Sequence, residues 1–329
     1  MIVASIFVHV LFNCTNEVDY DRLIKRNDIY YETNSENPFS GKSVKSYENG
    51  QQKFIAEFKN GKQHGTYKKW YENAQLQFEK DYSDGQLEGI LKSWYENGQQ
   101  ESISEWKEGK KNGAEKVWYE NGRLQSERNY TDGQLGGILK SWNEDGQQES
   151  ISEVKDNKLH GTSQAWHENG HKSSIMEYKD GELHGTFKVW YENGQQESIS
   201  EWTEGKKDGI DKVWYENGQQ ESITEYKDGK KNGTYKMWYE NGQQKTEIAV
   251  KDGEPHGISQ RWYENGQQEF IIEIKNGELH GTFKSWYENG QQQVISEHKD
   301  DELHGTYKKW YENGQQQEIS EWEDGERVK

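Results

Sequence analysis

Tryptophan recurs in this chain at a spacing of 24 residues that never slips. The positions are Trp70, Trp94, Trp118, Trp142, Trp166, Trp190, Trp214, Trp238, Trp262, Trp286 and Trp310. A fixed period of roughly 20 to 50 residues marks architectures in which each unit buries its apolar surface only against its neighbours. The sequence therefore predicts a repeat array and not a single globular core.

Twelve units of 24 residues fit end to end in the larger part of the chain. We expect a signal-like apolar segment at 1–14, a lead-in or N-terminal cap at 15–40, and the repeat array at 41–329. The first unit has Ser46 where the later units carry tryptophan. A terminal repeat has different neighbours, which accounts for such a departure.

The composition lies close to that of disordered chains. Leu, Ile, Val and Phe together make up only 53 of 329 residues, about 16%, and the net charge is −18, a combination that usually cannot offset chain entropy. The chain nevertheless carries 14 tryptophans and 20 tyrosines, and each aromatic ring can bury about 150 to 250 Å². We therefore expect an ordered array. Because its surface is uniformly acidic, we expect no nucleic-acid partner and no direct binding of the array to anionic membranes.

The N-terminal segment has features of an export signal. The apolar stretch 2–12 is too short to span a bilayer but fits the core of a signal peptide. Cys14, the only cysteine, is the candidate lipidation site of a bacterial lipoprotein, and Leu11 three residues earlier agrees with that interpretation. Asn13 and the lack of a basic residue before the apolar stretch argue against it. Localisation at the cell envelope and in the cytoplasm both stay open.

Each unit contains two turn signals. In the unit that starts at Gly89, Asn97-Gly98 suits a two-residue type I′ hairpin turn, because both residues tolerate positive φ. Glu108-Gly109 marks a return turn toward the next unit. The sequence predicts an all-β fold, an elongated array of about twelve 24-residue β-hairpins that form a continuous twisted antiparallel sheet.

A two-residue turn would also fix the pairing and the two faces of the sheet. It pairs Tyr95 with Gln100, Trp94 with Glu101 and Lys92 with Ile103. The charged face then holds Lys92, Trp94, Glu101, Ile103 and Glu105. The aromatic face holds Leu91, Ser93, Tyr95, Gln100, Ser102, Ser104 and Trp106, with further Tyr or Phe in other units. A bulged three-residue turn would instead shift the pairing by one residue. Because desolvating charge is costly, we expect the aromatic face to be more buried or to face a partner.

The repeated residues resemble a known family. Tyr-x-x-Trp-Tyr-Glu-Asn-Gly followed by Glu-(Trp/Tyr)-Lys-Asp-Gly-x-x-His-Gly is similar to the MORN-repeat variant of bacterial proteins that are often labelled antitoxin-like, and the likeness covers nearly all of 41–328. The resemblance implies an open β-sheet of successive hairpins with a binding or scaffolding role, and it carries over no catalytic residues. The sequence departs from the pattern at Ala74 and Asp145 in the Asn-Gly turns, and at Asn157 and Asp301 in the return turns.

No residue pattern points to catalysis, a metal or a cofactor. Six histidines precede a unit's first glycine, but equivalent positions lie two strands apart, about 9.6 Å, too far to share a metal ion bound at about 2.0 to 2.1 Å. We interpret them as turn-forming surface residues. Carboxylates such as Glu101 and Glu105 recur beside lysine in most units, which favours a solvated lattice of ion pairs over a glycosidase pair. The histidines are His64, His160, His184, His256, His280 and His304.

The tyrosine after each tryptophan is the candidate partner contact, because strand alternation places it on the aromatic face and the tryptophan among charges. The candidates are Tyr71, Tyr95, Tyr119, Tyr191, Tyr215, Tyr239, Tyr263, Tyr287 and Tyr311.

Three functions agree with the sequence. The first is a non-enzymatic repeat scaffold, at the bacterial cell envelope, that binds an unidentified protein partner. The second is a cytoplasmic antitoxin or immunity-type protein that masks a toxin, suggested by the resemblance and by the acidic surface. The third is polysaccharide binding through the aromatic stripes.

Overall fold

The computed structural model describes residues 16–329, so the candidate lipidation site Cys14 lies outside the described residues. The chain divides into two compact units, 1–148 and 149–329. Both are built from β-hairpins, and the predicted all-β class is confirmed. The one helix among the described residues is the short 3₁₀ helix η1 (Tyr20–Arg22). Nothing helical in 16–329 has the length and apolar character needed to cross a membrane.

The first unit starts with a lead-in and continues as a series of hairpins. In the lead-in, β1 (Glu17–Asp19) pairs in parallel with β4 (Gly41–Ser46), while β2 (Leu23–Arg26) and β3 (Ile29–Glu32) pair with each other. From β4 onward each strand is antiparallel to the next. These strands are β5 (Gln52–Lys59), β6 (Lys62–Trp70), β7 (Leu76–Ser83), β8 (Gln86–Trp94), β9 (Gln100–Lys107), β10 (Lys110–Trp118), β11 (Leu124–Thr131) and β12 (Gln134–Trp142).

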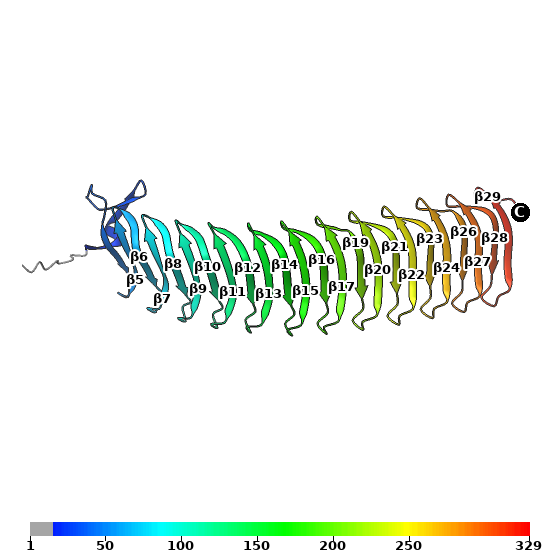
Figure 1. The fold of residues 1–329 in the computed structure, drawn as a ribbon, viewed down its shortest axis with the longest axis horizontal. Coiled ribbons are helices and arrows are strands. Elements are labelled where there is room, and N and C mark those ends of the chain that lie inside the picture. Colours follow the sequence, from blue (N-terminus) through cyan, green and yellow to red (C-terminus); the bar gives the residue numbers. More distant parts are fainter. Residues whose placement is uncertain (1–15) are drawn as a thin grey trace, which may run out of the picture. The chain divides into compact units, whose positions relative to one another are not determined.

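The second unit repeats the same hairpin without a lead-in. Figure 1 shows its strands as successive arrows joined by short turns. The strands are β13 (Gln148–Lys155), β14 (Lys158–Trp166), β15 (Lys172–Lys179), β16 (Glu182–Trp190), β17 (Gln196–Thr203), β18 (Lys206–Lys207), β19 (Gly209–Trp214), β20 (Gln220–Lys227), β21 (Lys230–Trp238), β22 (Gln244–Lys251), β23 (Glu254–Trp262), β24 (Gln268–Lys275), β25 (Glu278–Leu279), β26 (Gly281–Trp286), β27 (Gln292–Lys299), β28 (Glu302–Trp310), β29 (Gln316–Glu323) and β30 (Glu326–Arg327).

The Asn-Gly turn is a three-residue loop, so the prediction of a type I′ turn at this place is wrong. The Tyr95 N–H donates to the Gln99 carbonyl over 2.9 Å, and Tyr95 therefore closes on Gln99 and not on Gln100. Within the loop only Gly98 has a positive φ, of 84°, whereas type I′ needs two such residues. The Asn97 side chain accepts the Gln99 N–H over 2.9 Å, which stabilises this loop locally.

A β-bulge restores the expected register behind the turn. Trp94 pairs with Gln100 and not with Glu101, which corrects the predicted pair. The register then shifts by one residue, and Lys92 pairs with Ile103 as expected. Away from the bulge, alternation keeps Leu91, Ser93, Ser102 and Ser104 on one face and Lys92 and Ile103 on the other, as predicted. At the bulge the predicted faces are wrong: Gln100 pairs with Trp94, and the Glu101 carboxylate lies near the Tyr95 ring and helps to raise the pKa of Tyr95.

The return turn is the type I′ hairpin of each repeat. Glu108 and Gly109 have φ of 50° and 75°, and Lys107 pairs with Lys110 across them. Two consecutive positive φ values match the right-handed twist of the flanking strands. The type I′ turn predicted at Asn97-Gly98 therefore occurs at the other Xaa-Gly pair, Glu108-Gly109.

Residues that depart from the repeat pattern keep the turn geometry. Ala74 has φ of 66° where other repeats have glycine, and Asn157 and Asp301 have φ of 63° and 69° in the return turns. Asp145 is followed by Gly146, which retains φ of 83°. A residue with a Cβ pays roughly 1 kcal/mol or more for this conformation, so the surrounding ladders impose the turn.

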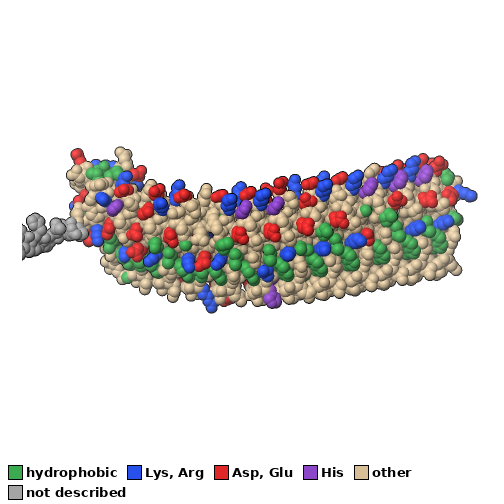
Figure 2. Space-filling model, viewed as in Figure 1, with side chains coloured by type: hydrophobic (Ala, Val, Ile, Leu, Met, Phe, Trp, Pro, Cys, Tyr) green, Lys and Arg blue, Asp and Glu red, His purple; other side chains and the backbone are tan. Residues whose placement is uncertain are grey.

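The aromatic face is the more buried side of the sheet in both units, as expected. Ser104 and Ser200 on this face are each 4% exposed, whereas Ile90 and Ile258 on the charged face are 47% and 55% exposed. The strands bend along their length in Figure 1, and side chains crowd on the inner side of a bend. Figure 2 shows rows of acidic and basic side chains beside a band of hydrophobic ones, which is the composition of the charged face.

The aromatic face carries charge in some repeats. Glu115 occupies the place of Leu91, is 7% exposed and pairs with Lys111, and its Oε2 lies 3.7 Å from Arg128 Nη1. The equivalent Asp211 in the second unit pairs with Lys207. Buried carboxylates require such partners. The charge-free face of the unit that starts at Gly89 is therefore not a property of every repeat.

The lead-in covers the aromatic face of the first repeats. Val18 and Phe39 pack against Ala56 and Phe58 in a small hydrophobic core, and the ring of Tyr30 lies 5.0 Å from that of Phe58. This packing shows directly that aromatic side chains of a peptide segment fit against this face.

Candidate functional site

The candidate contact tyrosines form a ladder of hydrogen bonds between successive repeats. Each hydroxyl donates to the backbone carbonyl of the tryptophan in the next repeat, over 2.7 to 3.0 Å. Tyr311 is 50% exposed and makes no such bond within 16–329. The ladder gives these tyrosines a structural role, and a partner contact through them stays a prediction. Its members are Tyr71, Tyr95, Tyr119, Tyr191, Tyr215, Tyr239, Tyr263 and Tyr287, together with Tyr47, which was not a candidate and makes the same bond to the Trp70 carbonyl over 2.7 Å.

Burial raises the pKa of four ladder hydroxyls, those of Tyr95, Tyr191, Tyr215 and Tyr263, above the ordinary tyrosine value. For Tyr191 the largest cause is desolvation, and the carboxylates of Glu197, Glu221 and Glu216 raise the pKa further. These tyrosines therefore stay protonated donors near neutral pH, and three carboxylates lie close enough to act on one phenol ring.

Asparagine forms a second ladder beside the first. Asn97 donates through Nδ2 to the Glu120 carbonyl of the next repeat over 3.0 Å, while its Oδ1 holds its own turn. The prediction from the sequence gave Asn97 a role in the turn conformation alone. The signal that identifies the second role is the recurrence of Glu-Asn two residues after ten of the eleven tryptophans of the 24-residue period, with Glu144-Asp145 as the exception; a turn requirement by itself does not demand it.

Two repeats replace the ladder tyrosine. His167 takes its place with Nε2 2.8 Å from the Trp190 carbonyl oxygen. Asn143 is too short for this bond and donates instead to the Gln147 side chain over 3.3 Å, within its own turn. An imidazole therefore substitutes for the phenol, whereas an amide does not.

The histidines before the repeat glycines lie at the return-turn edge. His160 Nδ1 is 3.4 Å from Asp180 Oδ1 and accepts the Asp180 N–H over 3.4 Å. In another repeat Glu88 accepts the Glu108 N–H over 2.9 Å from the same place. These side chains cap the return turn of the following repeat. Within 16–329 no group of three His, Cys, Asp or Glu residues is placed to hold a metal ion.

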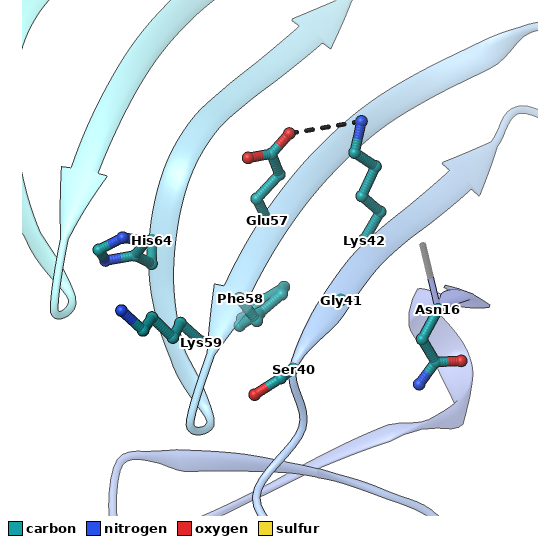
Figure 3. A pocket seen from close by; sticks show the side chains of 8 residues that line it. All are labelled: Asn16, Ser40, Gly41, Lys42, Glu57, Phe58, Lys59 and His64. Carbon is teal, nitrogen blue, oxygen red and sulfur yellow. Dashed lines mark ion pairs between the residues drawn. The ribbon is translucent and has the colours of Figure 1, made fainter. Parts of the chain in front are cut away.

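A cavity of about 380 Å³ lies in the first unit beside the lead-in (Figure 3). Lys42 Nζ lies 3.5 Å from Glu57 Oε1 at its wall, and Ser40 accepts the Asn60 N–H. The side chains of both members of the ion pair are more than a third exposed. The Ser40 hydroxyl already accepts a backbone hydrogen bond. This arrangement serves packing between the lead-in and the array.

A second cavity, of about 410 Å³, lies along the tyrosine ladder in the second unit. Its walls combine aromatic rings with carboxylates, which is a chemistry suited to cations. The lining residues are His167, Trp190, Tyr191, Glu192, Asn193, Glu197 and Glu216.

Successive hairpins tied by two ladders of side chains are the architecture of a repeat scaffold. The family described as MORN repeat variant matches nine segments that together cover more than half of the sequence, and the chain belongs to this family. The segments are 63–84, 87–108, 111–132, 159–180, 183–202, 231–252, 255–276, 279–300 and 303–324. A comparison with curated proteins finds no match.

Two of the solved structures that show a detectable likeness to this chain illustrate how weak it is. The crystal structure of TcdB2-TccC3 is 10% identical with a TM-score of 0.19, over 87% of this chain and 19% of that chain. The structure of the Photorhabdus luminescens Tc holotoxin pore is 10% identical with a TM-score of 0.18, over 92% of this chain and 19% of that one. The chain thus spans about a fifth of their length, and TM-scores this low carry no argument about fold or function.

Proposed function

We propose that the chain is a non-enzymatic scaffold that binds a protein partner along its aromatic face, held at a bacterial cell envelope by a lipid anchor at Cys14. The observation that supports binding through this face is the packing of the lead-in. Phe39 and Val18 bury themselves against the first repeats, so the face accepts apolar and aromatic side chains of a peptide.

In the second unit the same face carries large aromatic side chains. Phe187 pairs with Ser200 across strands β16 and β17, and Phe283 pairs with Ser296 across β26 and β27. A large ring beside a small serine leaves an uneven surface. Aromatic side chains on such surfaces contribute strongly to protein interfaces.

Site-specific photo-crosslinking tests the proposal in the native host. A photoreactive phenylalanine analogue at Phe283 reports on the aromatic face, and the same analogue at Ile258 reports on the charged face. We expect a crosslinked protein partner from Phe283 and little or none from Ile258. Equal crosslinking from both positions, or crosslinking from Ile258 alone, would contradict binding through the aromatic face.

The envelope part of the proposal has its own measurement. Mass spectrometry of the mature protein is expected to find an acylated N-terminal cysteine, Cys14. A product that retains Met1 would exclude the anchor and leave the proposal of partner binding in place.

A further inference from the structure

Two lysines of the chain already occupy the ring face of ladder tyrosines. Lys53 Nζ lies 5.1 Å from the centroid of the Tyr47 ring, and Lys245 Nζ lies 5.1 Å from that of Tyr239. Lys53 and Lys245 occupy the repeat position that is Glu101 in the repeat starting at Gly89. An ammonium group within about 6 Å of a ring centroid is attracted by the negative face of the ring. The repeat thus contains a position where a cation meets the ladder tyrosine.

Other repeats of the second unit have carboxylates where those lysines stand. Glu197 takes the place beside Tyr191, and Glu221 takes it beside Tyr215. Among the described residues, neither carboxylate lies within 4.0 Å of a lysine or arginine nitrogen. By contrast, Lys236 on the charged face pairs with Glu247 at 3.2 Å.

The surroundings of Tyr191 form an open cavity of about 410 Å³. Trp190 and His167 add rings to its wall, and Glu192 and Glu216 add carboxylates. The turn glutamates are exposed. A phenol ring flanked by unpaired carboxylates offers a cation both a π face and opposite charge.

We propose that the rings of Tyr191 and Tyr215, with Glu197 and Glu221, bind lysine side chains of an extended basic segment of the partner protein. This inference rests on the proposed scaffold function and specifies the chemistry of its partner. The lysines of the partner take the positions that Lys53 and Lys245 take within the chain.

The spacing of the two sites defines the spacing of the partner's lysines. Equivalent positions in adjacent repeats lie two strands apart, about 9.6 Å. A polyproline II segment rises about 9.3 Å over three residues. A segment with lysine at every third position therefore presents one ammonium group to each repeat without bending.

Fluorescence anisotropy with a labelled peptide of four Lys-Pro-Pro triplets tests this inference on the full chain. A second peptide has the same composition with its lysines adjacent. We expect the spaced peptide to bind the wild-type protein several-fold more tightly than the clustered one at a moderate salt concentration, where non-specific attraction is screened. Equal affinity of the two peptides would overturn the assigned spacing and with it the two-site arrangement.

Charge-reversal variants locate the site. The double variant Glu197→Lys with Glu221→Lys supplies its own ammonium groups, as Lys53 already does, and is expected to weaken binding of the spaced peptide about tenfold or more. The matched control is Glu182→Lys with Glu254→Lys, which makes the same charge change at the return-turn edge. Its expected effect is about twofold or less.

The control is matched in sequence as well as in charge, since Lys206 and Lys230 occur naturally at the place of Glu182. Circular dichroism confirms that both variants fold. Equal weakening by both variants would overturn the inference, because it would mean non-specific attraction to an acidic protein. If crosslinking from Phe283 still captures the native partner when Glu197 and Glu221 are lysine, the inference fails while the scaffold proposal stands.

Discussion

The Asn-Gly end keeps the same contacts in most hairpins, whereas the return-turn end varies from one repeat to the next. At the first end Tyr215 donates to the Trp238 carbonyl over 2.9 Å and Asn217 donates to the Glu240 carbonyl over 3.1 Å, and the same two bonds recur in most repeats. At the other end the capping residue is histidine, glutamate or asparagine from one repeat to the next. The fixed end sets the spacing between repeats, and the variable end tolerates substitution.

Burial explains the difference. The ladder tyrosines are partly buried, and their acceptors are backbone carbonyls that no neighbouring side chain replaces. Leaving a buried carbonyl without a donor costs about 1 to 3 kcal/mol. The return-turn caps are more accessible, with about two fifths of the His160 and His304 side chains exposed, so water can replace part of their contacts when they change. Four predictions follow from this contrast, in order of expected effect.

The return-turn end has one strict requirement, which is glycine at the start of each repeat. Gly185 has φ of 96°, and a Cβ there would collide with the Glu177 carboxylate. We expect Gly185→Ala to destabilise the protein by about 2 to 3 kcal/mol, from left-handed strain and the displaced glutamate together. Urea unfolding followed by tryptophan fluorescence measures the loss.

Gly257 provides the matched control. Its φ is 98°, but its nearest neighbour would be the Ala249 Cβ at 3.5 Å, an ordinary contact. Gly257→Ala should therefore cost only the backbone strain, about 1 to 2 kcal/mol. If the two variants lose the same free energy of unfolding, the Glu177 side chain moves away freely and the positive φ is the only reason for glycine at this position.

Asparagine at the two ends should differ in its contribution to stability. Asn217→Ala removes the bond to Glu240 and the 2.8 Å bond that Gln219 N–H donates to Asn217 Oδ1. We expect a loss of about 1 to 2 kcal/mol. Asn232→Ala at the return-turn edge removes one contact of 3.4 Å with Asp252 and should cost less than about 0.5 kcal/mol.

Hydrogen exchange of both variants places the loss in the structure. Faster exchange around 215–243 in Asn217→Ala, with little change in Asn232→Ala, is the expected pattern. If the two substitutions cost the same, the contrast between the two ends would not hold for asparagine.

The hydroxyl of the tyrosine ladder can be removed without changing the ring. Tyr215→Phe leaves the Trp238 carbonyl without its donor, and we expect a loss of about 1 kcal/mol. Tyr311→Phe removes a hydroxyl that is outside the ladder on a half-exposed ring and should be close to neutral. A neutral Tyr215→Phe would show that ring packing, and not the hydrogen bond, holds the ladder.

The array, the period and the two faces could be predicted from sequence, because they follow from recurrence and strand alternation. Ser104 on the buried face and Ile90 on the exposed face both lie where alternation puts them. The turn types could not be predicted from the sequence, because Asn97-Gly98 and Glu108-Gly109 are both compatible with a type I′ turn. Only the number of residues in the loop distinguishes the two turns. That length depends on the bulge beside Trp94, which no local residue preference specifies.

The candidate site was predictable only in part. The tyrosines could be selected by face, but their bonds to the next repeat depend on how adjacent hairpins stagger. The stagger also brings Glu216 from one repeat close to Tyr191 of the previous one. Contacts between side chains of neighbouring repeats cannot be derived from the sequence of one repeat.

Alkaline pH should weaken the ladder through the tyrosines themselves. Burial, then nearby carboxylates, raises the pKa of Tyr191, Tyr215 and Tyr263 above the ordinary value of 10.0. The folded chain therefore holds these protons more tightly than the unfolded chain, so the contribution is complete below about pH 10 and is lost as pH rises through the folded-state pKa. The free energy of unfolding, measured by urea titration from pH 8 to pH 11, should fall less steeply when all three are phenylalanine. Tyr311→Phe is the control and should keep the wild-type slope; a triple variant with that same slope would show that other groups cause the alkaline loss.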